Sequence, residues 1–79
     1  MKTAMPLYKW NIDVILRNSN VMRRCVYEGI ESNTLDVAEK VFGNKTENYF
    51  IDLKSENGKV DTWIRFGDIA SFDIYPVKK

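Results

Sequence analysis

The residue types that most often carry out catalysis are sparse in this 79-residue chain. It contains no histidine, which removes the commonest general base, the commonest metal ligand and the usual partner of a serine or cysteine nucleophile. The single cysteine, Cys25, lies in an apolar segment and is expected to be a small core residue. No zinc, EF-hand or phosphate-loop spacing occurs, and the scattered carboxylates are expected to be solvated. We therefore predict a protein that is not an enzyme, with no catalytic residue, no metal and no cofactor.

Aromatic and charged residues gather instead around one predicted hairpin. Asn57-Gly58 is typical of a two-residue type I′ turn, because both residues tolerate the positive φ that this turn requires. The turn sets a register that pairs six residues on one face: Lys54 with Asp61, Asp52 with Trp63, and Phe50 with Arg65. On the other face Ile51 lies opposite Ile64, so one face is charged and the other apolar, as a correct register requires.

Phe50, Trp63 and Arg65 are the first candidate binding residues. Aromatic and arginine side chains are typical anchors of protein interfaces, and the same trio could stack single-stranded bases. The alternative is structural, because the adjacent apolar pair Phe50-Ile51 suggests a strand buried on both faces, with the aromatic side chains under a helix. Both interpretations stay open at the level of sequence.

Arg23 and Arg24, with Arg17 across the first turn, form a local cationic cluster and are the second candidate site. Such a cluster either discourages aggregation of a sheet edge or contacts nucleic-acid phosphates. Lys and Arg number 12 against 11 Asp and Glu, and the net charge of +1 disfavours a binder of duplex nucleic acid.

These residues must be positioned by a few short elements. Tyr8 to Leu16 alternates as a strand, and Val21 to Tyr27 returns as a second strand whose register the sequence leaves open. Asn33 caps a helix of about nine residues that ends at Gly43-Asn44. The hairpin around Asn57-Gly58 and a last strand, Ser71 to Tyr75, follow it. The predicted order is strand, strand, helix, strand, strand, strand.

This order predicts a single α+β domain, residues 1–79, that is mainly antiparallel β. It fits a small curled sheet or an SH3-like or Sm-like barrel with the short helix over one open end, and an open sheet covered by the helix is the main alternative. The expected core is listed as follows: Trp10, Ile12, Val14, Leu35, Val41, Phe42, Ile51, Ile64, Phe66 and Ile74. No apolar run is long enough to span a membrane and no signal-peptide core is visible, which predicts a cytoplasmic protein.

Three segments carry a resemblance to a known class: Tyr27-Glu28-Gly29, Asp36-Val37-Ala38, and the stretch from Trp63 to Ile69. In style and length the chain resembles the small accessory proteins of Gram-positive phages and prophages. The resemblance implies a protein that acts by binding, for example by blocking a host or defence factor. We therefore predict a binding module for another protein, with single-stranded nucleic acid as the alternative partner and a homodimer through an exposed edge strand as a further expectation.

Overall fold

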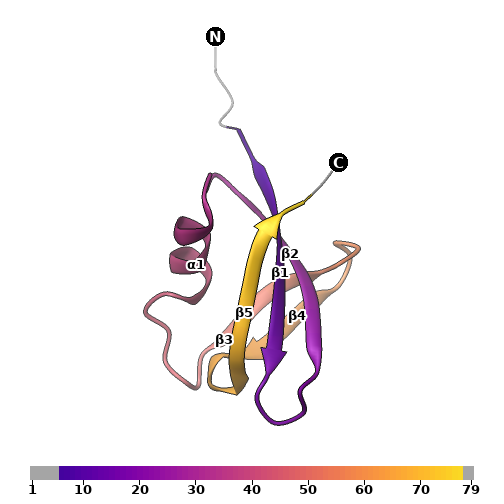
Figure 1. Ribbon diagram of the computed structural model, residues 1–79, viewed down its shortest axis with the longest axis vertical. Helices are drawn as coiled ribbons and strands as arrows, with labels where there is room; N and C mark the ends of the chain where they lie inside the picture. Colours follow the sequence, from indigo (N-terminus) through magenta and orange to yellow (C-terminus); the bar gives the residue numbers. More distant parts are fainter. Residues whose placement is uncertain (1–5, 78–79) are drawn as a thin grey trace.

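The computed structural model describes residues 6–77, which form one antiparallel sheet and one α-helix (Figure 1). The elements in chain order are β1 (Tyr8–Leu16), β2 (Met22–Gly29), α1 (Thr34–Phe42), β3 (Phe50–Ser55), β4 (Asp61–Arg65), a 3₁₀ turn (Phe66–Asp68) and β5 (Ile69–Pro76). The predicted order and the α+β class are confirmed. No helix within residues 6–77 has the length and apolar character that crossing a membrane requires.

The sheet is curled but open. Its strand order is β4-β3-β2-β1-β5, so β4 and β5 are the two edges and no ladder joins them. The 3₁₀ turn carries the chain from β4 to the end of β1, where Ile69 pairs with Leu16, and β5 therefore takes β1 as its partner instead of β4. In Figure 1 β3 and β4 pass behind β1 and β5. Of the forms that the sequence allowed, the small curled sheet is confirmed, and the sheet does not close into a barrel.

The core lies between the inner face of this curled sheet and α1. Trp10, Ile12 and Val14 of β1 are buried there, and the Phe42 ring of α1 stacks on Phe72 with a centroid distance of 3.9 Å. Seven of the ten predicted core residues are buried, while Phe66 and Ile74 are partly buried against the core. Val37, Cys25, Leu53 and Ile69 complete it.

Leu35 is the error in the predicted core, because its side chain is 74% exposed. The helix begins after the Asn33 cap as expected, with the Asn33 side chain accepting from the Asp36 amide. Its buried stripe, however, is formed by Val37, Val41 and Phe42, and Leu35 lies at the margin of that stripe on the first turn. The left-handed residue that follows the helix is Asn44, at φ 55°, and Gly43 is extended.

The register of the β3–β4 hairpin is as predicted, but its turn is not type I′. Gly58 has φ +74°, whereas Asn57 does not have positive φ. The Ser55 amide donates to Val60 and the Gly58 amide donates to Ser55, which makes a four-residue loop. The Asn57 side-chain oxygen accepts from the Lys59 amide at 2.9 Å and so stabilises the longer loop. The longer loop adds one residue to each side of the turn and therefore preserves the pairing.

The first hairpin settles the register that the sequence left open. Ile12 pairs with Cys25, and the Leu16 amide donates to Val21 across a four-residue turn. Cys25 consequently faces the core and is 1% exposed, as expected. Strand β5 continues through Pro76, which pairs with Trp10, because the proline nitrogen lies on an edge strand where no ladder donor is needed.

Candidate functional site

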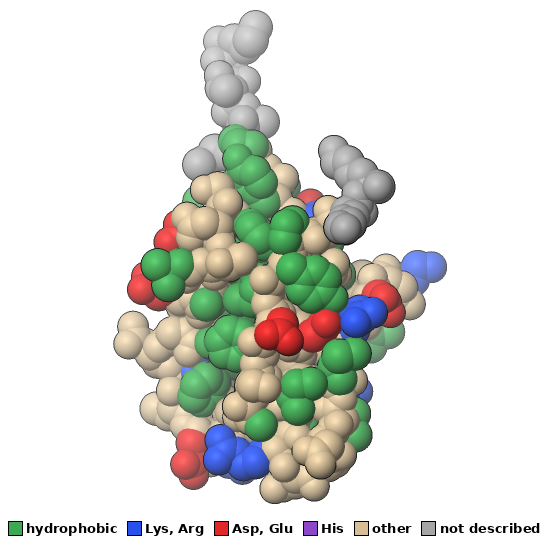
Figure 2. Space-filling view, in the orientation of Figure 1, with side chains coloured by type: hydrophobic (Ala, Val, Ile, Leu, Met, Phe, Trp, Pro, Cys, Tyr) green, Lys and Arg blue, Asp and Glu red, His purple; other side chains and the backbone are tan. Residues whose placement is uncertain are grey.

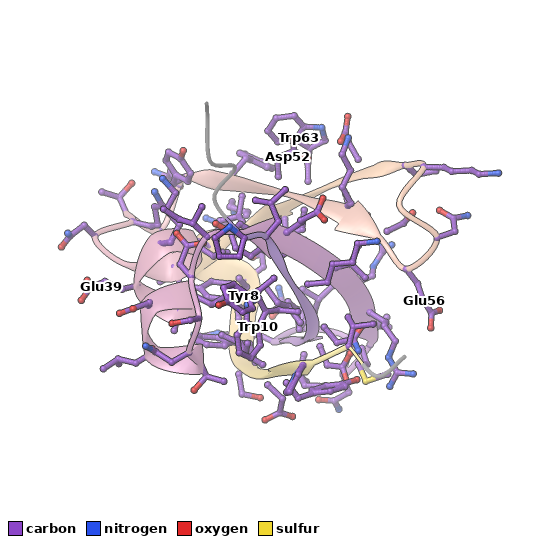
Figure 3. The ribbon with its side chains drawn as sticks, turned by 90° about the horizontal axis from the view of Figure 1, so that it is seen from above. Tyr8, Trp10, Glu39, Asp52, Glu56 and Trp63 are labelled. Atoms are coloured by element: carbon purple, nitrogen blue, oxygen red, sulfur yellow. The ribbon has the colours of Figure 1, made fainter. Side chains whose placement is uncertain are left out.

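The outer side of the β3–β4 hairpin is the surface on which the predicted aromatic residues lie. We call it the hairpin face and define it by the side chains that alternate outward on the two strands: Phe50, Asp52, Lys54, Asp61, Trp63 and Arg65. Phe50 is 54% exposed and Trp63 is 61% exposed, so the alternative in which the helix covers them is wrong. Figure 3 shows Trp63 and Asp52 projecting from the hairpin on the side away from Trp10.

The inner side of the same hairpin explains this exposure. Ile51, Leu53 and Ile64 alternate with the outward residues and are buried, at 4 to 5% exposure. A shift of one residue in the register would exchange the two sides, so the apolar inner row holds the aromatic row in solvent. The hairpin face is therefore a consequence of the core and is presented on a paired backbone.

Arg65 is held in place on the hairpin face. Its guanidinium donates to the Asp68 carboxylate at 2.7 Å and to the Asn48 side chain at 3.1 Å. The Asp68 carboxylate raises the pKa of Arg65 above its ordinary value. Arg65 pairs with Phe50 across the two strands, so an aromatic ring and an oriented guanidinium stand side by side.

The charges of the hairpin face are balanced. Lys54 donates to Asp61 at 2.6 Å, and this carboxylate raises the pKa of Lys54. Asp52 and Asp61 match Lys54 and Arg65 in number, which leaves the face with no net charge. The hairpin face therefore combines exposed aromatic side chains with charged side chains that are mostly neutralised by ion pairs to neighbouring residues.

Two shallow hollows meet at the aromatic pair. One, of about 380 Å³, is lined by Arg23, Phe50, Trp63 and Arg65 together with Leu16, Ile64 and Asp68. The other, of about 410 Å³, lies between α1 and β3 and is also lined by Phe50 and Trp63. The structure thus brings together four of the five candidate binding residues, although Arg23 comes from β2, far from the hairpin in sequence.

Arg24 is the candidate that lies elsewhere. It pairs with Asp13 on the opposite side of the sheet, where its guanidinium donates to both carboxylate oxygens at 3.0 and 3.3 Å. Tyr75 donates to the same carboxylate at 2.8 Å. Asp13 is only 7% exposed, so the expectation that the carboxylates are solvated is wrong for this residue. The arginine cluster is divided because neighbouring residues of a strand point to opposite faces.

Figure 2 shows the side of the molecule formed by β5, β1 and α1, where acidic and basic side chains interrupt the hydrophobic ones.

The Arg24 guanidinium lowers the pKa of the Asp13 carboxyl, and the hydrogen bond from Tyr75 acts in the same direction against the effect of burial. This network contributes to the packing of β1 against β2 and β5, and it leaves Arg24 engaged within the fold.

Sequence reasoning missed one aromatic residue beside the site. Tyr49 is 48% exposed, and the Lys45 ammonium lies 4.6 Å from the centre of its ring. Both residues line the hollow between α1 and β3, next to Phe50. The spacing of Lys45 and Tyr49 carries no signal outside a helix, so only the path of the chain into β3 brings them together.

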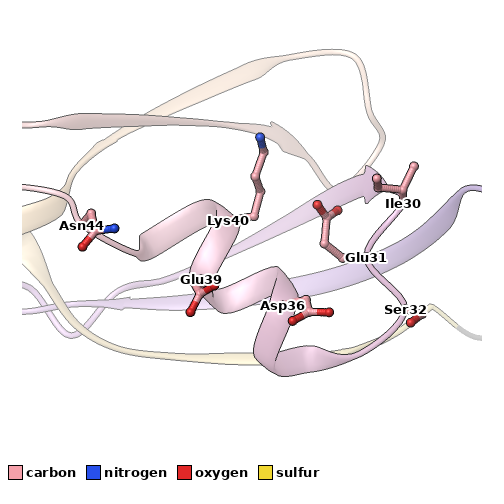
Figure 4. Close-up of a pocket in the computed structure, with 7 residues that line it drawn as sticks. All are labelled: Ile30, Glu31, Ser32, Asp36, Glu39, Lys40 and Asn44. Atoms are coloured by element: carbon pink, nitrogen blue, oxygen red, sulfur yellow. The ribbon is translucent and has the colours of Figure 1, made fainter.

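A separate hollow of about 530 Å³ lies beside α1 and is rich in carboxylates (Figure 4). Glu31, Asp36 and Glu39 line it, but their carboxylates point in different directions. Glu31 accepts from the Tyr27 hydroxyl at 2.7 Å, and burial together with this carboxylate raises the pKa of Tyr27 to about 12. Within residues 6–77 no group of three His, Cys, Asp or Glu side chains is placed to hold a metal ion. The carboxylates of this hollow do not form a converging pair.

Comparison with known proteins adds no relative: no family model, no curated protein and no solved structure matches the chain. The function must therefore be argued from the hairpin face itself.

Proposed function

We propose that this chain is a non-enzymatic binding module that docks another protein on the hairpin face. The observation that carries the proposal is the pair of exposed aromatic side chains, Phe50 and Trp63, placed between two hollows on a pair of hydrogen-bonded strands. Large aromatic residues exposed on so small a domain are a liability for solubility unless a partner covers them. The oriented Arg65 beside them is the third residue type enriched among the anchors of protein interfaces.

The charge pattern favours a protein over single-stranded nucleic acid as the partner. Lys54 and Arg65 each contact a carboxylate, so a phosphate would have to displace Asp61 or Asp68 to reach them. Asp52 beside Trp63 would repel a nucleic-acid backbone. Binding driven by phosphate contacts needs cations that are free to release counterions, whereas a protein surface of mixed charge matches this face directly.

The resemblance to phage accessory proteins supports the same class of function. A small module with a fixed aromatic surface is suited to blocking a surface of a host or defence protein. A partner of this kind would bury Phe50 and Trp63 in its own hollow and place polar groups around Arg65.

The experiment compares three immobilised forms of the chain in a cell extract: the wild type, Trp63→Ala combined with Arg65→Ala, and Leu35→Ala as the matched control. Leu35 is exposed on α1, outside the hairpin face, so its truncation removes similar apolar surface at another place. Proteins retained by the wild type and the control but lost by the double variant are then purified and titrated. We expect the double variant to lose at least about tenfold in affinity, because interface anchors typically contribute 2 kcal/mol or more.

Two results would overturn the proposal. A folded double variant that binds the purified partner as tightly as the wild type would place the interface elsewhere. Saturable binding of single-stranded DNA or RNA that falls steeply between about 50 and 200 mM salt, and that requires Trp63, would replace the protein partner with nucleic acid. Thermal unfolding of each variant confirms that the comparison is made between folded chains.

A further inference from the structure

We infer that a second copy of this chain pairs with β4 along its free edge, in an antiparallel dimer whose two-fold axis passes beside Trp63. This interface is formed by the backbone edge of the hairpin and joins two copies of the chain, so it goes beyond the binding of another protein proposed above. Strand β4 pairs with β3 on one side only and ends the sheet. Its free edge therefore carries backbone groups that a neighbouring strand can satisfy.

The backbone groups of three residues point toward that edge. The Phe66 amide donates to Tyr49 and the Ser55 amide donates to Val60, both at 2.7 Å, which identifies the hydrogen-bonded pairs at the two ends of the hairpin. In an antiparallel pair every second residue directs its N–H and C=O groups toward the partner strand. The N–H and C=O groups of residues 62 and 64 therefore face β3. Those of Asp61, Trp63 and Arg65 consequently face outward.

Charge complementarity selects the register of the pairing. When β4 runs antiparallel to itself about Trp63, Asp61 lies opposite Arg65 of the second copy, and Arg65 lies opposite the second Asp61. Trp63 then lies opposite Trp63, and each outward-facing residue exchanges its backbone hydrogen bonds with its counterpart. Within each copy Asp61 keeps its contact with Lys54 and Arg65 keeps its contact with Asp68, and the opposite charges across the two strands add to these ion pairs without replacing them. The aromatic pair at the centre adds to the effect. Trp63 is the middle residue of the five that form β4, so two residues of the strand lie on each side of the two-fold axis.

The two neighbouring registers lack this complementarity. Moving the two-fold axis by one residue toward the loop places Arg65 opposite Lys59 of the second copy, and these two cations repel each other. Moving it the other way places Asp61 opposite Gly67, where it finds no charged partner. Charged residues on an edge usually prevent such pairing, but on β4 their order makes them attractive in one register and unfavourable in the next.

A hollow of the surface adjoins the end of β4, where the second copy would approach. The hollow of about 380 Å³ touches Trp63, Ile64 and Arg65, three consecutive residues whose side chains alternate between the two faces. Leu16, Arg23 and Phe50 of the same chain also line this hollow, so the second strand would pass between β4 and these side chains. The dimer would place the two hairpin faces next to one another on one continuous sheet, with the two Trp63 side chains at their junction.

The first test measures the molar mass of the purified chain by light scattering or sedimentation, up to about 1 mM, a concentration at which any micromolar dimer is nearly complete. We expect a dimer in the wild type. Asp61→Arg sets Arg opposite Arg65 and Arg65→Asp sets Asp opposite Asp61, so each variant alone should raise the dissociation constant at least about tenfold. A mixture of the two variants restores both charge pairs and should form the heterodimer. Lys59→Asp changes the charge by the same amount outside β4 and should leave the dimer intact.

The second test reads the register directly and does not depend on charge. Opposed residues in a hydrogen-bonded pair have Cα atoms about 5.5 Å apart, within reach of a disulfide. Under mild oxidation Trp63→Cys should therefore form a covalent dimer, whereas Val60→Cys, an equally accessible position next to β4, should not. Cys25 is buried and does not interfere.

A wild type that remains monomeric at about 1 mM would overturn the inference, and so would a dimer that persists in both charge variants or cross-links equally through Val60→Cys. These measurements use the chain alone, so their outcome is independent of whether the hairpin face binds another protein. Loss of partner binding with an intact dimer, or the reverse, would separate the two proposals.

Discussion

Asp13 shows how much one buried carboxylate contributes to this fold. It lies on β1 with Arg24 of β2 on one side and Tyr75 of β5 on the other, and both donate to it. The side chain of Asp13 is 10% exposed, while that of Arg24 is 43% exposed. Removal of the carboxylate would leave Arg24 free to be hydrated, so the loss is that of charged hydrogen bonds and does not include an unpaired buried cation.

We expect Asp13→Asn to lower the free energy of unfolding by about 1 to 3 kcal/mol at neutral pH, because the three hydrogen bonds that the charged acceptor receives from Arg24 and Tyr75 are weakened or lost. Urea denaturation followed by fluorescence measures this change. Asp73→Asn is the matched control, since Asp73 is an exposed carboxylate directly opposite Asp13 on β5. A loss as large for Asp73→Asn would mean that the general charge of the strand, and not the network, is responsible.

The same residue predicts a dependence of stability on pH. The pKa of Asp13 is lower in the folded chain than its ordinary value, chiefly through the hydrogen bond from Arg24. The unfolded chain therefore binds this proton more readily, and the stabilisation is complete above about pH 5 and lost as the pH falls through the folded pKa. The difference in unfolding free energy between wild type and Asp13→Asn should shrink steadily from pH 5 toward pH 2. A difference that stays constant across this range would contradict the assignment.

At the scale of elements, the loop of the β3–β4 hairpin depends on one backbone conformation. Gly58 has φ +74°, and a side chain built there would meet no atom within 4 Å. Any cost of substitution therefore comes from the backbone and not from crowding. Gly58→Val should destabilise the fold by about 1 to 3 kcal/mol, whereas Gly58→Asn should cost less, because asparagine tolerates the left-handed region. Equal thermal unfolding temperatures for the two variants would contradict this account.

Helix α1 is attached to the sheet through its buried stripe of Val37, Val41 and Phe42. Phe42 is 6% exposed and stacks on Phe72 of β5, while Leu35 on the first turn is 74% exposed. A helix of nine residues is too short to be stable by itself in water, so this attachment determines whether it forms.

Phe42→Ala should therefore lower the free energy of unfolding by about 3 to 5 kcal/mol, the usual cost of truncating a buried aromatic residue. Leu35→Ala on the same helix should change it by less than about 0.5 kcal/mol. Chemical denaturation of both variants, with circular dichroism for the helix, tests the contrast. A comparable loss in the two variants would show that the helix docks through a different stripe.

For the whole molecule, the structure indicates two parts of unequal stability. Strands β2, β1 and β5 pair along most of their lengths, whereas β2 and β3 share only the pairs Cys25 with Ser55 and Val26 with Lys54. The β3–β4 hairpin is held largely by its inner apolar row and by the short bonds at its base, such as that from Gly67 to Glu47. Local opening of this hairpin breaks few hydrogen bonds with the rest of the sheet.

Native-state hydrogen exchange should consequently be faster for the amides that are hydrogen-bonded between β3 and β4 than for the amides that join β1 to its neighbours. The expected cause is opening of the hairpin as a unit, so these amides should share one free energy of opening that lies below that of global unfolding. Equal protection in β1 and β4 would mean that the domain opens only as a whole.

The amino-acid sequence by itself determined the features that depend on near neighbours. The alternation from Tyr8 to Leu16 set the bounds of β1 and the Asn33 cap set the start of α1. The Asn57-Gly58 turn predicted the register of β3 against β4, and the charge pairs across the hairpin agreed with it. It also placed Phe50, Trp63 and Arg65 on one face, because residues two apart on a paired strand lie on the same side. The turn type was predicted wrongly, but the register stayed correct, because the longer loop takes one residue from each of the two strands.

Only the tertiary structure decided which segments far apart in the chain become neighbours. It placed β5 beside β1 and so left the sheet open, buried Asp13 between Arg24 and Tyr75, and brought Arg23 to the aromatic pair. These outcomes depend on how the curled sheet and helix share one core, and a short pattern of residues carries no information about contacts across that distance. The exposure of Trp63 follows for the same reason, because it depended on whether α1 packed on the inner or the outer side of the hairpin.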